Sequence, residues 1–249
     1  MNTDILCLRV LLVTPAAPLR DLLRQAAAHA SVPAEVMEAD GAATAKTLIA
    51  QGSDLLLLDG GMPAAEKTAI CQAARAARQN PFIIAIGGDP GTGAEVDGSV
   101  QKPQTAKDAQ KIVDRCIRSR CPTRVLIIDE SPTMRGIVRK ILAASKFPLE
   151  VADSDDSVKA LPQLRGGNFD IAFLDSNMPV LNGFGMLSEL RGLQPDVATV
   201  IMSTTDNSAV AECAQTAGAI ALLKKPFFPA DVDAVLYRLY EIDAPARTD

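Results

Sequence analysis

The chain has 249 residues, a formal net charge of −5 and an apolar fraction of 48%. This length fits two domains of ordinary size, and the composition is typical of folded protein, so it excludes disordered and fibrous classes. The acidic excess lies entirely in the second half of the chain, which argues against direct binding of nucleic acid. Since no apolar run approaches the roughly 18 residues of a membrane span and no signal-peptide pattern opens the chain, we expect a cytoplasmic protein without membrane insertion.

The five cysteines are odd in number and none are spaced as CxxC, so the sequence favours reduced thiols over disulfides or a zinc site. His29 is the only histidine, which excludes a metal site built from several histidines. We expect His29 to lie on a helix surface.

Three segments of the first half recur in the second half, two of them at offsets of 115 and 116 residues. Arg9–Thr14 recurs as Arg124–Asp129, Asp54–Pro63 as Asp170–Pro179, and Lys102-Pro103 as Lys225-Pro226. Such a repeat indicates a tandem duplication. It predicts two domains, residues 5–120 and residues 123–241, joined by a short linker that ends near Pro122.

The second copy alternates short apolar runs with stretches of helical period, which is typical of βαβ units on a parallel sheet. The five expected strands are Val125–Ile128, Leu149–Ala152, Ile171–Leu174, Val200–Met202 and Ile220–Leu223. The later expected helices are Asp156–Leu164, Gly183–Arg191, Ala209–Ala217 and Pro229–Glu241. The predicted fold class is α/β, with a doubly wound (βα)5 layer in each copy.

A helix is expected directly after the first run of the second copy. Ser131 and Pro132 supply an N-cap and a first-turn proline. Five apolar residues then fall at helical spacing and predict one face packed on the sheet: Met134, Ile137, Val138, Ile141 and Leu142.

Polar residues follow the expected strands, at the carboxyl ends where a doubly wound sheet binds ligands. Asp129 and Glu130 follow the first strand, Asp175 the third, Ser203 the fourth and Lys225 the fifth. Three carboxylates at one sheet edge predict a site for a hard cation such as Mg²⁺. Lys225 adds an ammonium that can bind a phosphoryl oxygen.

The segment Ile128–Arg135, taken with Asp175–Pro179, resembles the CheY-like receiver domains of two-component response regulators. The resemblance covers about residues 123–241 and implies a flavodoxin-like fold. It implies that Asp175 accepts a phosphoryl group, with Mg²⁺ held by Asp129, Glu130, Asp175 and the backbone carbonyl of Asn177. It also implies that Lys225 and the hydroxyl of Ser203 bind the phosphoryl oxygens.

One residue departs from the family pattern: Leu222 stands where many receivers have Tyr or Phe, three residues before the lysine. Phosphorylation is still expected because Leu222 lies outside the acidic pocket. The response of the output surface is expected to differ from that of CheY-like proteins.

In the first copy the same register puts Thr14-Pro15 at the acidic pair and Ile86 at the hydroxyl position, and keeps only Asp59 and Lys102. We therefore expect a degenerate pseudo-receiver with no metal site, in which Lys102 pairs with Asp59. The segment from Ile86 to Lys102 is shorter than its counterpart and rich in glycine. It predicts a flexible loop and a shortened or missing fourth helix.

The leading functional hypothesis is a response regulator without enzymatic activity. A histidine kinase or phosphotransfer protein donates to Asp175, and the phosphorylated domain binds a downstream target protein or a second copy of itself. Residues 242–249 read as a short polar tail with no effector, so the expected output is protein binding.

Three alternatives remain open. The chain can be the receiver input section of a longer regulator with an effector such as a diguanylate cyclase. A phosphatase of the haloacid-dehalogenase type would need a second Asp two residues after the nucleophile, where Asn177 stands. A DNA-binding regulator is the least favoured, since no helix-turn-helix segment remains.

Overall fold

The computed structural model describes the backbone of residues 7–88, 95–178, 183–191, 197–205 and 208–245. Contacts divide the chain into two compact units. The first unit runs to Cys121 and also takes up the segment that begins at Tyr240, and the second unit spans Pro122–Leu239. Within the described residues no helix is long and apolar enough to cross a membrane.

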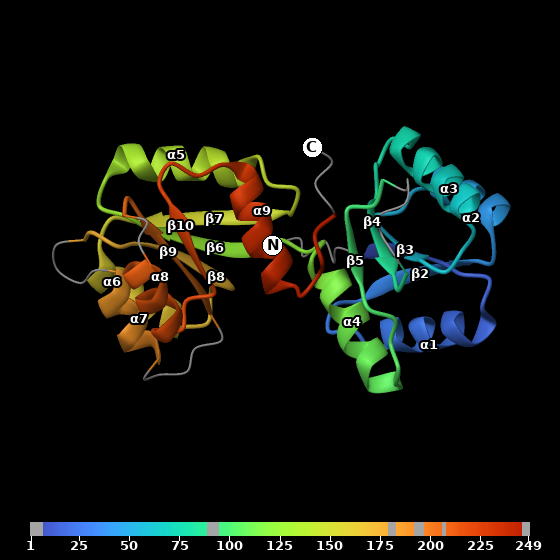
Figure 1. Cartoon of the computed structure of the whole chain (residues 1–249), viewed down its shortest axis with the longest axis horizontal. Coiled ribbons are helices and arrows are strands. Elements are labelled where there is room, and N and C mark those ends of the chain that lie inside the picture. The colour runs from blue at the N-terminus through green and yellow to red at the C-terminus, as the bar shows by residue number, and fades with distance from the viewer. Residues whose placement is uncertain (1–6, 89–94, 179–182, 192–196, 206–207, 246–249) are drawn as a thin grey trace. The chain divides into compact units, whose positions relative to one another are not determined.

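The first unit alternates strands and helices around a parallel sheet of order β2-β1-β3-β4-β5. Its strands are β1 (Leu8–Val13), β2 (Ala34–Ala39), β3 (Leu55–Asp59), β4 (Phe82–Ile86) and β5 (Gly98–Val100). Its helices are α1 (Ala17–Ala28), α2 (Ala42–Gln51), α3 (Ala64–Ala76) and α4 (Ala106–Arg118). Helices α1 and α4 cover one face of this sheet and α2 and α3 the other (Figure 1).

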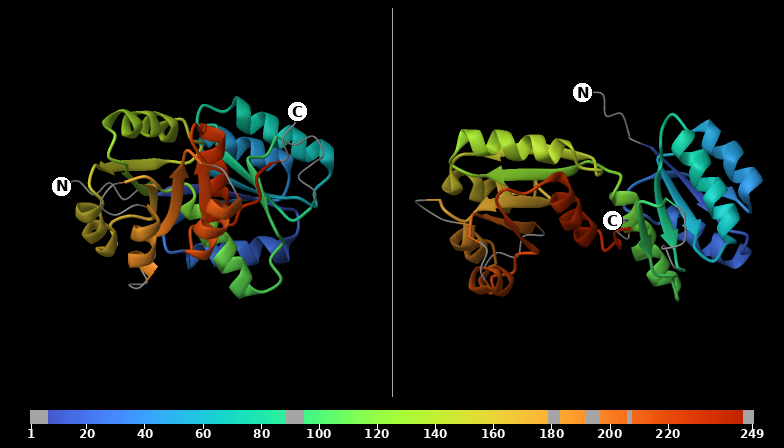
Figure 2. Two further views of the ribbon diagram at one scale, coloured as in Figure 1. Left: turned by 60° about the vertical axis from the view of Figure 1, so that its left-hand side comes forward. Right: turned by 45° about the horizontal axis from the view of Figure 1, so that its top comes forward.

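The second unit repeats this plan with order β7-β6-β8-β9-β10, again all parallel. Its strands are β6 (Thr123–Ile128), β7 (Leu149–Ser154), β8 (Ile171–Asp175), β9 (Ala198–Ser203) and β10 (Ala221–Lys224). Its helices are α5 (Pro132–Ala143), α6 (Ser157–Arg165), α7 (Gly183–Arg191), α8 (Ser208–Thr216) and α9 (Pro229–Leu239). Figure 2 shows α5 and α9 on one face of the sheet and α6 and α7 on the other.

The central strands are buried on both faces, which explains their unbroken apolar runs. All five residues of β3 and all five of β8 are buried, including the acidic residue that ends each strand. Parallel pairing sets Asp59 beside Ile86 of β4 and Asp175 beside Met202 of β9. The duplicated core thus delivers one buried carboxylate to the same sheet edge in each unit.

Helix α5 begins as expected but buries only part of its predicted apolar face. The Ser131 hydroxyl accepts a hydrogen bond from the Met134 N–H, and Pro132 is the first helical residue. Val138 and Leu142 are fully buried, whereas Ile137 is 45% exposed. The prediction of a single packed stripe was wrong for Ile137, because α5 turns that side of the helix toward a cleft instead of the sheet.

The first unit has no described helix between β4 and β5. Gly87 and Gly88 have positive φ, and residues 95–97 are coil and bend, while residues 89–94 lie outside the described residues. Arg75 at the end of α3 binds this segment through the Glu95 carbonyl and the Asp97 carboxylate, each at 2.8 Å. The predicted shortening of the fourth helix therefore falls largely outside the described chain.

The segment after α9 is built into the first unit. Asp243 and Ser99 of β5 exchange two backbone hydrogen bonds of 2.8 and 2.9 Å as an antiparallel bridge. Glu241 forms an ion pair of 2.6 Å with Arg115 of α4, and Tyr240 and Ile242 are buried. This segment covers part of the exposed edge that β5 would otherwise present.

We expect Ile242→Ala to destabilise the first unit by about 2 kcal/mol, because it removes a buried aliphatic side chain. The measurement is the urea dependence of thiol labelling at Cys71 and Cys116, which are buried in this unit. Phe228→Ala, at a side chain 65% exposed in the second unit, is the control and should leave that labelling curve unchanged. An identical curve for Ile242→Ala and wild type would contradict the packing described.

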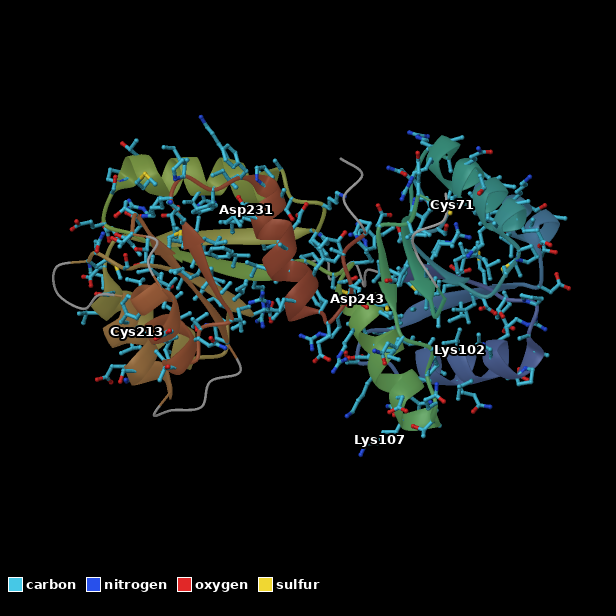
Figure 3. The ribbon with its side chains drawn as sticks, in the orientation of Figure 1. Cys71, Lys102, Lys107, Cys213, Asp231 and Asp243 are labelled. Atoms are coloured by element: carbon cyan, nitrogen blue, oxygen red, sulfur yellow. The ribbon has the colours of Figure 1, made fainter. Side chains whose placement is uncertain are left out.

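All five cysteines are free thiols in the structure, and their environments differ. Cys7 and Cys213 are exposed, while Cys71 lies buried on α3 (Figure 3). Burial raises the pKa of the Cys116 thiol to about 12.

At pH 8 the Cys116 thiol should stay protonated and unreactive, because only the thiolate attacks alkylating reagents. Iodoacetamide should modify Cys7 and Cys213 within minutes and leave Cys116 intact in the folded protein. Peptide mapping by mass spectrometry measures this. Early modification of Cys116 would show that its burial is wrong.

Candidate functional site

The polar edge of the second unit centres on one lysine between two buried carboxylates. The Lys225 ammonium, at the end of β10, donates to Asp129 Oδ2 at 2.8 Å and to Asp175 Oδ1 at 3.0 Å. The side chains of Lys225, Asp129 and Asp175 are 10%, 2% and 10% exposed. These residues are 50 and 96 positions apart in sequence, so only the parallel sheet brings them together.

Backbone groups fix the Asp129 carboxylate further. Its Oδ1 accepts a hydrogen bond of 2.9 Å from the Ser131 N–H, and the Asp129 N–H continues the strand pairing by donating to the Ser154 carbonyl. One oxygen of the carboxylate thus faces the Lys225 ammonium and the other faces the start of α5.

A cleft of about 460 Å³ opens over this group. One part of its wall is polar and contains Asp129, Glu130, Asp175, Asn177, Thr204 and Lys225. The other part is apolar and comes from α5 and the β10–α9 connection, through Met134, Ile137, Val138, Ile141 and Phe227. The exposure of Ile137 is explained by this cleft, since its side chain forms part of the rim.

The three acidic residues of the sequence prediction line one cleft, but only two of them contact Lys225. Asp129 and Asp175 meet at Lys225, while Glu130 is exposed. Among the described residues, no group of three His, Cys, Asp or Glu side chains is already gathered as a metal site. The assignment of these residues as metal ligands stays a prediction.

Ser203 lies at the end of β9 and is buried. Its hydroxyl accepts a hydrogen bond of 3.1 Å from the Thr205 N–H, whereas its neighbour Thr204 lines the cleft. The role of Ser203 in phosphoryl binding remains a prediction. Thr204 was missed in the sequence, where three consecutive hydroxyl residues give no signal of which one faces the ligand.

Glu130 also borders a second hollow of about 360 Å³, on the α6 side. Asp156 caps α6 in this hollow, and the backbone N–H groups of Lys159 and Val158 lower the pKa of its carboxyl. The cap therefore carries negative charge at neutral pH beside Glu130, so this side of the site is acidic.

The corresponding edge of the first unit is closed. The Asp59 carboxylate accepts hydrogen bonds from the Thr14 hydroxyl at 2.6 Å and from the Gly61 N–H at 2.9 Å. Lys102 is exposed, and the described contacts of the Asp59 carboxylate include no ion pair with it, so the prediction of that pair was wrong. The Thr14 hydroxyl satisfies the carboxylate without a second charge.

Two loops at this edge of the first unit touch through their backbones. A Cβ added to Gly60 would lie 1.6 Å from the Gly87 carbonyl oxygen, so the two loops are in direct backbone contact. The buried Lys67 ammonium donates to the Gly60 carbonyl at 2.9 Å. Lys67 was missed in the sequence because its partner is a backbone atom, which no side-chain pattern indicates.

Comparison with known proteins agrees with this geometry. The protein-family model described as response regulator receiver domain matches residues 125–237 of this chain. Chemotaxis protein CheY-3 of Vibrio cholerae is 32% identical over 121 residues, which cover 47% of this chain and 92% of that protein. The chain therefore belongs to the response regulator receiver family of two-component signalling, through its second unit.

Two further relatives place limits on this assignment. A protein-glutamate methylesterase/protein-glutamine glutaminase of Rhizobium etli is 31% identical over 106 residues, but the chain covers only 30% of that protein. A solved structure is titled "Structure of probable two-component system response regulator/GGDEF domain protein". Its superposition covers 94% of this chain and 98% of the chain in that structure, with a TM-score of 0.53 and 20% sequence identity. That match shows the fold of two receiver-like units. The first unit is the degenerate member of the pair.

Removing the central ammonium should destabilise the second unit. We expect Lys225→Met to lower the free energy of unfolding by about 3 kcal/mol, because it leaves two buried carboxylates without their cation. Chemical denaturation followed by circular dichroism measures the loss. Lys159→Met, at an ammonium 73% exposed, is the control and should change stability by less than about 0.5 kcal/mol. Equal effects of the two substitutions would contradict the central role of Lys225.

Proposed function

We propose that this protein is a response regulator whose second unit accepts a phosphoryl group on Asp175. The observation that carries the proposal is the Lys225 ammonium held between Asp129 and Asp175 in an open cleft. Asp175 is the nucleophile, since its second oxygen is not engaged by Lys225. Phosphoryl transfer to an aspartate requires an acceptor carboxylate, here Asp175, together with positive charge to offset the repulsion of the phosphoryl oxygens, here from Lys225. Asp129 supplies the neighbouring carboxylate.

The transfer exchanges one bond for another. A carboxylate oxygen of Asp175 attacks the phosphorus of a phosphohistidine on a histidine kinase or a phosphotransfer protein. The P–O bond forms as the P–N bond breaks, and the leaving imidazole takes up a proton. Lys225 then pairs with a phosphoryl oxygen, and Ser203 or Thr204 donates a hydroxyl to another.

The donor set of the cleft fits Mg²⁺. The polar part of the wall offers oxygen ligands of the kind hard cations prefer, from Asp129, Asp175, Glu130 and Asn177. When bound, Mg²⁺ would offset the repulsion between the carboxylates and the phosphoryl oxygens. We propose Asp129, Glu130, Asp175 and Asn177 as its ligands, and a cytoplasmic location for the protein.

Output in this proposal is binding of a target protein, or of a second copy, by the phosphorylated unit. The first unit, proposed as a domain of residues 5–120 with a shortened or missing fourth helix, takes no phosphoryl group. The proposed limit of the phosphorylated domain is residues 123–241, although the contacts group Tyr240 and Glu241 with the first unit. An alternative keeps the same chemistry and makes the chain the input section of a longer regulator with a diguanylate cyclase. Reading the gene beyond Asp249 separates the two.

The test is phosphorylation by a small donor. With acetyl phosphate and Mg²⁺, intact-mass spectrometry should detect one phosphoryl group on the wild type, and chelation of Mg²⁺ should abolish it. Asp175→Asn should lose the modification. Asp59→Asn is the matched control, the same change at the same position of the other repeat, and should retain it.

Two results would overturn the proposal. One is undiminished phosphorylation of Asp175→Asn, which would move the acceptor elsewhere. The other is labelling of Asp59, which would mean that the closed edge of the first unit is chemically competent.

A further inference from the structure

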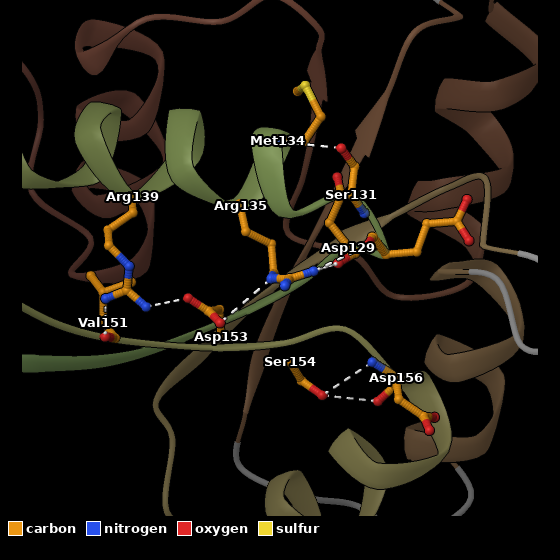
Figure 4. Close-up of polar contacts among 10 residues, drawn as sticks. Asp129, Ser131, Met134, Arg135, Arg139, Val151, Asp153, Ser154 and Asp156 are labelled. Carbon is orange, nitrogen blue, oxygen red and sulfur yellow. Dashed lines mark hydrogen bonds and ion pairs between the residues drawn. The ribbon is translucent and has the colours of Figure 1, made fainter.

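A second basic side chain, Arg135, contacts the acidic loop, residues 129–131, which joins β6 to α5. Arg135, in the second turn of α5, folds back over the start of its helix (Figure 4). Its guanidinium donates to the backbone carbonyl of Asp129 at 2.8 Å and to that of Glu130 at 3.1 Å. It therefore binds the backbone of both residues that carry the acidic pair.

The guanidinium is itself held in place. Its Nε lies 3.5 Å from Asp153 Oδ1 on β7, and the Arg135 side chain is only 17% exposed. Asp153 also pairs with Arg139, one turn further along α5. The loop between β6 and α5 has only three residues, so fixing two of its carbonyls leaves it little freedom.

The consequence concerns the direction of two side chains. The Asp129 carboxylate is already fixed by Lys225 and by the Ser131 N–H, but Glu130 is exposed and none of the described hydrogen bonds or ion pairs involves its carboxylate. What the structure fixes for Glu130 is its backbone, through Arg135.

We propose that Arg135 is a positioning residue for the cation and phosphoryl site, acting through the Asp129 and Glu130 carbonyls. This inference rests on the proposed function, because it assigns Arg135 a role toward the Mg²⁺ ligands. Removing a residue that holds a metal ligand in place, without touching the metal itself, typically weakens metal binding by 10- to 100-fold.

The first unit provides a test of the alternative, a purely structural role. There Arg20 donates to the Thr14 carbonyl at 2.9 Å and its Nε lies 3.4 Å from Glu38. This arginine clasp, an arginine that binds a backbone carbonyl of the first loop and an acidic residue of the second strand, is thus present although Thr14-Pro15 replaces the acidic pair. If the clasp served folding alone, its loss would have the same consequences in both units. If it positions ligands, only the loss in the second unit changes cation binding.

The experiment is calorimetric titration of the full chain with Mg²⁺ alone, together with thermal unfolding. We expect Arg135→Gln to raise the Kd for Mg²⁺ about tenfold. Arg139→Gln is the matched control: Arg139 contacts Asp153 and the Val151 carbonyl but not the acidic loop, so its loss should change Kd by less than twofold. Arg20→Gln should likewise leave Kd unchanged.

Two further variants cover the case in which Arg135→Gln folds poorly. Arg135→Lys keeps the charge and can reach one carbonyl, so it should restore part of the affinity. Asp153→Asn removes the group that holds the guanidinium and should raise Kd about threefold, a smaller effect than loss of Arg135 itself.

The outcomes separate the two proposals. If the wild type binds no Mg²⁺, the proposed function fails and this inference fails with it. If the wild type binds Mg²⁺ and Arg135→Gln binds it equally well, or if Arg139→Gln weakens binding as much, the positioning role alone is overturned.

Discussion

The second unit depends on one electrostatic arrangement, the Lys225 ammonium between the Asp129 and Asp175 carboxylates. Two buried carboxylates repel each other and would be costly without a shared cation. The same ammonium makes the site adaptable, because it can exchange a carboxylate oxygen for a phosphoryl oxygen without losing its pairing. The groups whose ion pairs offset the cost of burial are thus the groups to which we assign phosphoryl transfer.

The first unit shows what the same fold does without that arrangement. Its buried Asp59 accepts hydrogen bonds from the Thr14 hydroxyl and a backbone N–H, and the loops that begin at Gly60 and Gly87 are in direct backbone contact. The strand order and the arginine clasp on the first loop are retained. The first unit therefore keeps the sheet of the second unit but lacks the acidic pair, since Thr14 and Pro15 stand in place of Asp129 and Glu130. The segment from Tyr240 onward adds a strand-like contact to this unit alone.

Some of this was readable from the residues. The two copies, the strands and most helices follow from apolar runs and helical spacing, and Ser131 and Pro132 marked the start of α5 correctly. Two expectations were wrong: Ile137 lines a cleft instead of packing on the sheet, and Lys102 makes no ion pair with Asp59. Both concern the direction of a side chain, which depends on neighbouring elements that the spacing of apolar residues does not describe.

The sequence by itself determined that the chain carries two (βα)5 units and which acidic, hydroxyl and basic residues stand at the strand ends, because burial on both faces of a parallel sheet imposes a local pattern. Tertiary structure alone decided how those residues meet. Asp129 and Lys225 are 96 positions apart, and the clasp of Arg135 on two backbone carbonyls leaves no trace in residue type. Contacts of this kind depend on strand register and on backbone atoms, which every residue shares.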